Sequence, residues 1–171
     1  MEFSYYYTLE YLPTRYVASD NDWNNRHAVW DFKDGICHES IANDMVEIIK
    51  HIADGHESDY IICFIPASTT DKTTRRYGTV SRKLADRTGV KTSLSAISKT
   101  SDTESGHISG KSCNPTTDFV FDNNCFNGKK VILIDDVITR GRTFTDTAVK
   151  LINKGAESVV GLFVAKTVNP S

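Results

Sequence analysis

The residues with the clearest chemical potential are two adjacent aspartates, Asp135 and Asp136, in the run VILIDDVITRGRTF (residues 131–144). Four apolar residues precede the pair, and a polar turn containing Gly141 follows it before an apolar periodic segment begins. Adjacent carboxylates can accept hydrogen bonds from two neighbouring hydroxyls. A glycine turn that leads into a helix presents backbone N–H groups and the positive end of a dipole to an anion. The run therefore predicts a site for a ligand that carries both hydroxyls and an anionic group.

Two other classes of protein also place acids after a buried strand. P-loop nucleotidases need an upstream G-x-x-x-x-G-K-[ST] loop. The segment SGHISGKS (105–112) comes near to it, but Ser105 occupies the first glycine position and no apolar strand precedes the segment. Receiver domains need paired acids near their first strand and an aspartate well downstream, whereas no aspartate follows Asp146 here. Neither class fits the chain.

The run VILIDDVITRGRT resembles the phosphoribosyl pyrophosphate (PRPP) motif of type I phosphoribosyltransferases. That pattern is four apolar residues, two acids, two apolar residues, Thr, any residue, Gly, any residue and Thr, and every constrained position is met. The resemblance extends over roughly residues 28–167. It implies an α/β fold and a ligand that joins a sugar to phosphate groups.

The resemblance also implies a role for each part of the site. Asp135 and Asp136 would hold the ribose and act as catalytic residues together with Arg76. Arg76, with Arg75 as a second candidate, would face pyrophosphate. Magnesium would bind through PRPP, with the two aspartates as its only candidate protein ligands. The other implied contacts are Thr139, Arg140, Gly141, Arg142 and Thr143 for the 5′-phosphate, Ala67, Ser68, Thr69 and Thr70 for pyrophosphate, and Lys166 for the acceptor.

Within this family the chain is most similar to the ComF-type amidophosphoribosyltransferase-like proteins. The segments RRYGTVSRKLA and NPTTDFVFDNNCFNGKKVILIDDVITRGRT carry this likeness. Three features depart from the family's usual patterns. The chain lacks the paired cysteines of an N-terminal zinc ribbon, it has two extra cations in Arg140 and Arg142, and it has Thr139 where purine-salvage enzymes carry an aspartate base.

The implied function is transfer of phosphoribose from PRPP to a nitrogen acceptor, with Mg²⁺ as cofactor and release of pyrophosphate. A non-catalytic PRPP- or nucleotide-binding regulatory module remains an alternative, as does a ComF-like protein linked to DNA uptake. Dimers are common for this fold, so a homodimer stays open. The motif leaves the acceptor unidentified, and the aromatic residues Trp23, Trp30 and Phe32 could stack on it or serve as core or interface.

Composition excludes several other functions. The chain has 171 residues, 39% hydrophobic and 25% charged, with a net charge of −2 and a pI of about 6.2. This balance does not favour nucleic acid as the main partner. No apolar run is long enough to span a membrane, and the first residues have no secretory pattern. The four cysteines form no C-x-x-C pair, so we expect a cytoplasmic protein with free thiols and no zinc.

Strands and helices alternate along the chain. Apolar runs predict buried strands over residues 60–66, 131–134 and 158–165, with a weaker strand over 90–97 and a short one at DFVF. Helical spacing predicts a helix after Ser40 as N-cap and up to Gly55, a second from Thr79 as N-cap to Gly89, and a third from Thr143 to Gly155. Residues 67–78 and 98–117 read as polar loops, and residues 1–35 show no clear period.

This alternation predicts one α/β domain with a mostly parallel central sheet, helices on both faces and a small N-terminal hood. We place the hood and first helix in residues 1–58 and the core in residues 59–171. Ligands of such sheets bind beyond the carboxyl ends of the strands. The loop 98–117 matches the family's flexible catalytic loop, where Lys99 and Lys111 could meet pyrophosphate or remain solvated.

Overall fold

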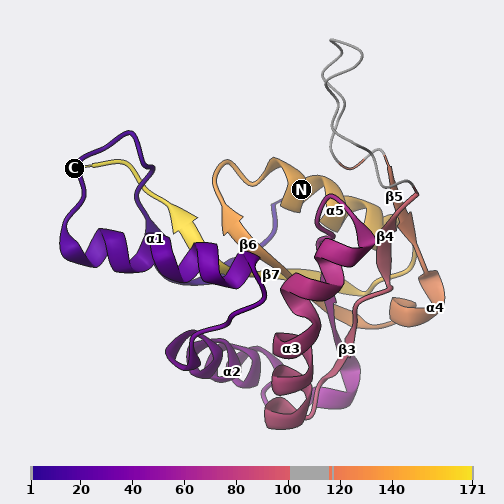
Figure 1. Ribbon diagram of the computed structural model, residues 1–171. Coiled ribbons are helices and arrows are strands. Elements are labelled where there is room, and N and C mark those ends of the chain that lie inside the picture. The colour runs from indigo at the N-terminus through magenta and orange to yellow at the C-terminus, as the bar shows by residue number, and fades with distance from the viewer. Residues whose placement is uncertain (1, 101–115, 117, 171) are drawn as a thin grey trace.

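The computed structural model of the chain describes residues 2–100, 116 and 118–170. Figure 1 shows the arrangement of its elements. In chain order they are β1 (Tyr5–Tyr11), α1 (Asp20–Lys33), α2 (Glu39–Ala53), the 3-10 turn η1 (Glu57–Asp59), β2 (Tyr60–Phe64), α3 (Thr70–Thr88), β3 (Lys91–Ser93), β4 (Ile97–Lys99), β5 (Phe119–Phe121), α4 (Asn123–Phe126), β6 (Lys130–Ile138), α5 (Arg142–Asn153) and β7 (Ser158–Thr167).

The central sheet has five parallel strands in the order β1-β7-β6-β2-β3, and β4 pairs with β5 in a separate antiparallel ribbon. Because all five strands run the same way, the segments that follow them reach one common edge of the sheet. Strand β2 after Tyr60 and the part of β6 from Val131 to Ile134 are buried, which explains why they read as continuous apolar runs.

Helices cover both faces of this sheet, as predicted. One core contains apolar residues of α1, α2 and α3 against one face of β2, β6 and β7. The other contains residues of α5, α4 and β4 against the opposite face. The fold is therefore a three-layer α/β domain with a mostly parallel sheet.

The predicted polar loop over residues 67–78 is wrong for most of its length, because α3 begins at Thr70. Thr69 is the N-cap, and its hydroxyl accepts a hydrogen bond from the Lys72 N–H at 3.1 Å, so the predicted cap at Thr79 is also wrong. The buried face of this first half of α3 consists of Thr73, Tyr77 and their neighbours. These buried residues recur at helical spacing. The spacing was not recognised in the sequence because Thr73 and Tyr77 are not purely apolar residues. The predicted end of this helix at Gly89 is confirmed.

Other boundaries also differ from the expectation. The cap of α2 is His38, whose side chain makes no capping hydrogen bond, rather than Ser40. The predicted strand over 90–97 divides into β3 and the start of β4, and α5 begins at Arg142, one residue before the predicted start. The short strand at DFVF is confirmed as β5. Most of the predicted loop 98–117, including Lys111, lies outside the described residues.

The N-terminal segment supplies one strand of the sheet and also part of the structure at the carboxyl edge of the sheet. Residues 5–11 form β1, the edge strand beside β7, so this part of the predicted hood belongs to the central sheet. The segment that follows β1 lies at the carboxyl edge, and α1 then passes next to β6 (Figure 1). No helix among the described residues is both long and apolar enough to cross a membrane.

Candidate functional site

Strand β6 does not stop at the two acids but continues through them to Ile138. Asp135 pairs with Phe163 and Val137 with Ala165, while Asp136 has no partner in the β6–β7 ladder. The Asp136 N–H donates to Asp135 Oδ1 at 2.8 Å, and the Val137 N–H donates to Asp136 Oδ1 at 2.7 Å. At Asp136 and Val137, the backbone N–H therefore bonds to the side chain of the preceding aspartate in β6. The sequence predicted that the strand ends at Ile134, before the two acids, whereas both acids lie within β6.

Asp135 is partly buried against a tyrosine that the sequence did not single out. The Tyr77 hydroxyl donates to the Ile65 carbonyl at 2.8 Å and lies 3.2 Å from Asp135 Oδ1. Tyr77 is fully buried, and its ring packs on Phe64 with centroids 4.7 Å apart. One hydroxyl thus connects α3, the end of β2 and the first acid.

Asp136 has two cations beside it. Its Oδ2 lies 3.5 Å from Lys33 Nζ, at the end of α1, and 3.8 Å from Arg76 Nη1, on α3. Burial acts to raise the pKa of Asp136, but its hydrogen bond with Asp135 and the charges of Lys33 and Arg76 together lower it. Burial and the neighbouring carboxylate raise the pKa of Asp135 well above its ordinary value. The pair is consequently asymmetric, since the pKa of Asp135 is raised and that of Asp136 is lowered.

The resemblance implies that Arg76 contacts pyrophosphate. In the structure its side chain lies next to Asp136. Its side chain is 19% exposed, and its Nε is buried without a hydrogen-bond partner among the described residues. An unsatisfied buried donor is costly, so this atom suits an acceptor that arrives with a ligand. Arg75 is by contrast largely exposed and pairs with Asp34 at 4.0 Å.

The turn after β6 forms one wall of a cavity of about 300 Å³. Residues along this cavity include Asp135, all five members of the predicted phosphate loop, Thr139 to Thr143, and the ring of Phe144. Gly141 has a φ of 76°, in the left-handed region, and is the N-cap of α5. The first N–H groups of a helix have no acceptor within it, so they remain directed at this turn. The structure thus brings Asp135 and the predicted phosphate loop together.

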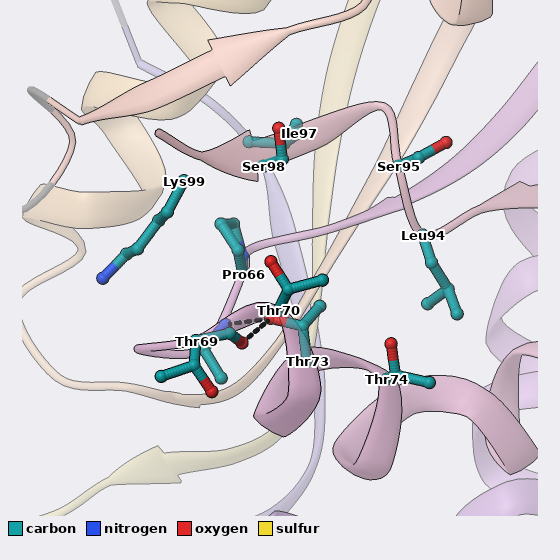
Figure 2. Close-up of a pocket in the computed structure, with 11 residues that line it drawn as sticks. Pro66, Thr69, Thr70, Thr73, Thr74, Leu94, Ser95, Ile97, Ser98 and Lys99 are labelled. Atoms are coloured by element: carbon teal, nitrogen blue, oxygen red, sulfur yellow. Dashed lines mark hydrogen bonds between the residues drawn. The ribbon is translucent and has the colours of Figure 1, made fainter. Parts of the chain in front are cut away.

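The predicted pyrophosphate loop is shorter than expected, because Thr70 already belongs to α3. The Ala67 N–H donates to Thr73 Oγ1 at 2.9 Å, and that hydroxyl donates to the Thr69 carbonyl. Ala67, Thr69 and Thr70 line a pocket of about 160 Å³, and exposed Ser68 does not. Figure 2 shows Lys99 on β4 across this pocket from the first turn of α3.

Lys166 lies near the end of β7, and its ammonium is 5.5 Å from the ring centre of Tyr5 and 5.7 Å from that of Tyr7. The side-chain contacts described for it are with the edge strand β1 rather than with the acids. Among the three aromatics considered for the acceptor, Phe32 is a core residue, whereas Trp23 is 45% exposed and packs edge-on against Trp30. A role in acceptor binding stays a prediction for Lys166, Trp23 and Trp30.

The donor set limits how a magnesium ion could be held. Carboxylate oxygens are suitable ligands for this hard cation. Asp136 is already faced by two positive charges, however, and no cluster of three or more metal-ligating side chains occurs in the described part of the chain. The residues fit an ion carried mainly by phosphate and hydroxyl oxygens of a ligand, with Asp135 as the protein carboxyl beside it.

Tyr77 and Lys33 were missed by sequence reasoning. Tyr77 could be found only as part of a helical period, four residues after Thr73, once α3 is known to start at Thr70. No sequence signal marks Lys33, because its approach to Asp136 depends on how α1 crosses the sheet.

Comparison with known proteins yields only distant structural likeness. No family model matches the chain, and none of the curated proteins matches it. One similar solved structure is the allosteric regulatory enzyme of purine biosynthesis, with 13% identity and a TM-score of 0.49; the matched region covers 80% of this chain but 30% of that one.

Two further similar structures are the hypoxanthine phosphoribosyl transferase of Trypanosoma cruzi and the purine phosphoribosyltransferase of Pyrococcus horikoshii Ot3. The first shares 13% identity and a TM-score of 0.48, covering 77% of this chain and 75% of that one. The second shares 14% identity and a TM-score of 0.46, covering 76% and 88%. Likeness at this level assigns neither an activity nor a substrate to this chain.

Proposed function

We propose that the protein is a phosphoribosyltransferase that transfers phosphoribose from PRPP to a nitrogen acceptor and releases pyrophosphate. The observation that carries the proposal is the cavity shared by Asp135 and residues 139–143. It combines a carboxyl for sugar hydroxyls with a glycine turn and a helix N-terminus for a phosphate. A sugar 5-phosphate presents both groups at once.

The chain's own residues would divide the work as follows. Asp135 accepts hydrogen bonds from the ribose, and the turn from Thr139 to Thr143 holds the 5′-phosphate. The buried Nε of Arg76 donates to an oxygen of the pyrophosphate, a task that suits a guanidinium. The bond at C1′ breaks with positive charge developing on the sugar, so positioning and charge stabilisation supply most of the barrier reduction.

Magnesium, when bound with the ligand, would neutralise the leaving pyrophosphate. The acceptor enters as a nucleophilic nitrogen that forms the new bond at C1′. Thr139 cannot act as a base towards a purine ring, and its hydroxyl lies 2.8 Å from that of Thr167. The absence of an aspartate at this position favours an acceptor other than a salvaged purine. The likeness to ComF-type proteins and the link to DNA uptake remain predictions.

Calorimetry with PRPP and Mg²⁺ tests the binding part of this proposal. The double variant Asp135→Asn, Asp136→Asn should bind PRPP too weakly to detect, because it removes the carboxylates and their charge. The matched control is Asp44→Asn, Glu47→Gln, which changes two exposed acids of α2. Unchanged affinity in the site variant would refute the assignment.

Pyrophosphate release in the presence of PRPP and a panel of nucleobases and amines tests the catalytic part. Release that depends on one acceptor supports the transferase. Binding of PRPP without release for any member of a broad panel favours the non-catalytic regulatory module instead.

A further inference from the structure

The two aspartates of β6 are neighbours in sequence but have different surroundings. Asp135 lines the cavity beside the phosphate loop, and Asp136 is not among the residues that line it. Asp136 instead directs Oδ2 towards Lys33 and Arg76, while its Oδ1 accepts from the Val137 N–H. Both oxygens of Asp136 are therefore engaged within the protein.

The turn at the end of α1 packs closely against α3 at Arg75, and this contact positions Lys33 near Asp136. A Cβ on Gly35 would lie 2.2 Å from the Arg75 carbonyl oxygen, so only glycine allows the two backbones to approach this closely. Gly35 also has a φ of 88°, which side chains rarely adopt. Asp34 pairs with Arg75 across the same contact.

Three consecutive residues of α3 connect this contact to the acid pair. Arg75 meets the turn after α1, Arg76 lies beside Asp136, and Tyr77 reaches Asp135. The position of Lys33 relative to Asp136 is thus determined by backbone packing as well as by charge. The side chains of Asp136 and Arg76 are 13% and 19% exposed, so this pair is less screened than a surface pair, whereas Lys33 is 47% exposed and its interaction is screened more.

Resting on the proposed function, we propose that Lys33 is a positioning residue of the sugar-phosphate site. With Arg76 it holds Asp136 as a paired carboxylate, which leaves Asp135 as the acid that contacts the ligand. The N-terminal segment thereby supplies a charge to a site otherwise built from the core. The geometry agrees with this division, because Lys33 and Arg76 both face Oδ2 of Asp136, whereas Asp135 lines the cavity beside the phosphate loop.

A double-mutant cycle on the free energy of unfolding tests the Lys33–Asp136 pair without any ligand. The effects of Lys33→Gln and Asp136→Asn should be non-additive, with the double variant losing less than the sum of the two, because both remove one shared ion pair. Lys50→Gln, in the last turn of α2, is the matched control, and its effect should add to that of Asp136→Asn. Additive effects of Lys33→Gln and Asp136→Asn would overturn the inference.

Calorimetry with PRPP and Mg²⁺ then separates the two acids. Asp135→Asn should lose binding, whereas Asp136→Asn and Lys33→Gln should weaken it by roughly tenfold or less, as expected for loss of a positioning ion pair. Equal losses in Asp135→Asn and Asp136→Asn would contradict the division. If the wild type does not bind PRPP, the proposed function fails, and the double-mutant cycle still decides whether Lys33 holds Asp136.

Discussion

At the scale of single residues, the site depends on the buried hydroxyl of Tyr77 and on Asp135, whose pKa is raised by burial and by the neighbouring carboxylate. Tyr77 bonds to the Ile65 carbonyl and approaches Asp135, so it positions the end of β2 and the first carboxyl together. Asp135 gains no cation of its own within 4.0 Å among the described residues, in contrast to Asp136. A carboxyl in such surroundings suits hydrogen bonding to hydroxyls but costs stability when ionised.

Asp135→Asn is therefore expected to stabilise the folded protein at neutral pH while removing its proposed function. The folded pKa of Asp135 lies above its ordinary value, so this group favours folding at low pH, and its contribution is lost as pH rises through the folded pKa. We expect the variant to gain about 1 kcal/mol in the free energy of unfolding at neutral pH, a usual size for relieving a functional site. The gain should shrink towards about pH 4, the ordinary carboxyl range.

Urea unfolding at several pH values measures this difference. Asp44→Asn, at an exposed position of α2, is the control and should show no comparable change. A variant less stable than wild type at neutral pH, or a gap that persists at low pH, would contradict the prediction.

At the scale of elements, α1 is secured by a buried guanidinium. Arg26 is 1% exposed and donates to the carbonyls of Leu12 and Pro13 at 2.7 and 2.8 Å and of Tyr16 at 3.1 Å. Its guanidinium also lies 4.7 Å from the ring centre of Trp23. These bonds fold the segment after β1 back onto α1, the helix that carries Lys33 to the acid pair.

Arg26→Met should lower the free energy of unfolding by roughly 3 kcal/mol, because it leaves several backbone carbonyls without their charged donor. Arg15→Met is the control, since Arg15 is exposed and contacts only the ring of Tyr16 among the interactions described for it. Thermal and urea unfolding of both variants give the measurement. Equal stability of the two variants would show that the buried guanidinium has no special role.

At the scale of the whole molecule, the phosphate loop depends on close packing of α5 over the sheet. Gly161 of β7 lies under Phe144 at the start of α5, and a Cβ there would come within 2.8 Å of both Phe144 and Phe163. Because Gly161 has no side chain, the ring of Phe144, in the first turn of α5, packs directly on β7.

Gly161→Ala should destabilise the protein by about 1–3 kcal/mol through overpacking, and should weaken PRPP binding by shifting the start of α5. Gly78→Ala is the matched control, because a Cβ at this helical position meets nothing within 4 Å and alanine favours helix. It should be neutral or slightly stabilising. Chemical unfolding and calorimetry measure the two effects, and a Gly161→Ala protein as stable as wild type would contradict the packing argument.

The sequence by itself determined the α/β class, the buried strands and the run of acids and glycine turn. These features are local, since a strand buried on both faces is continuously apolar and a turn residue with a positive φ, as at Gly141, favours glycine. The first half of α3 was missed because its buried face is made of Thr73 and Tyr77, whose polar groups are satisfied only in the folded chain.

Only the tertiary structure decided how the two acids differ. Asp135 and Asp136 are identical in type and adjacent in sequence, so no local pattern can assign one to the cavity and the other to Lys33 and Arg76. That assignment follows from α1 crossing to β6 and from the backbone of Gly35 meeting that of Arg75. Contacts between residues distant in sequence set the charge around each carboxyl, and charge and burial together shift the two pKa values in opposite directions.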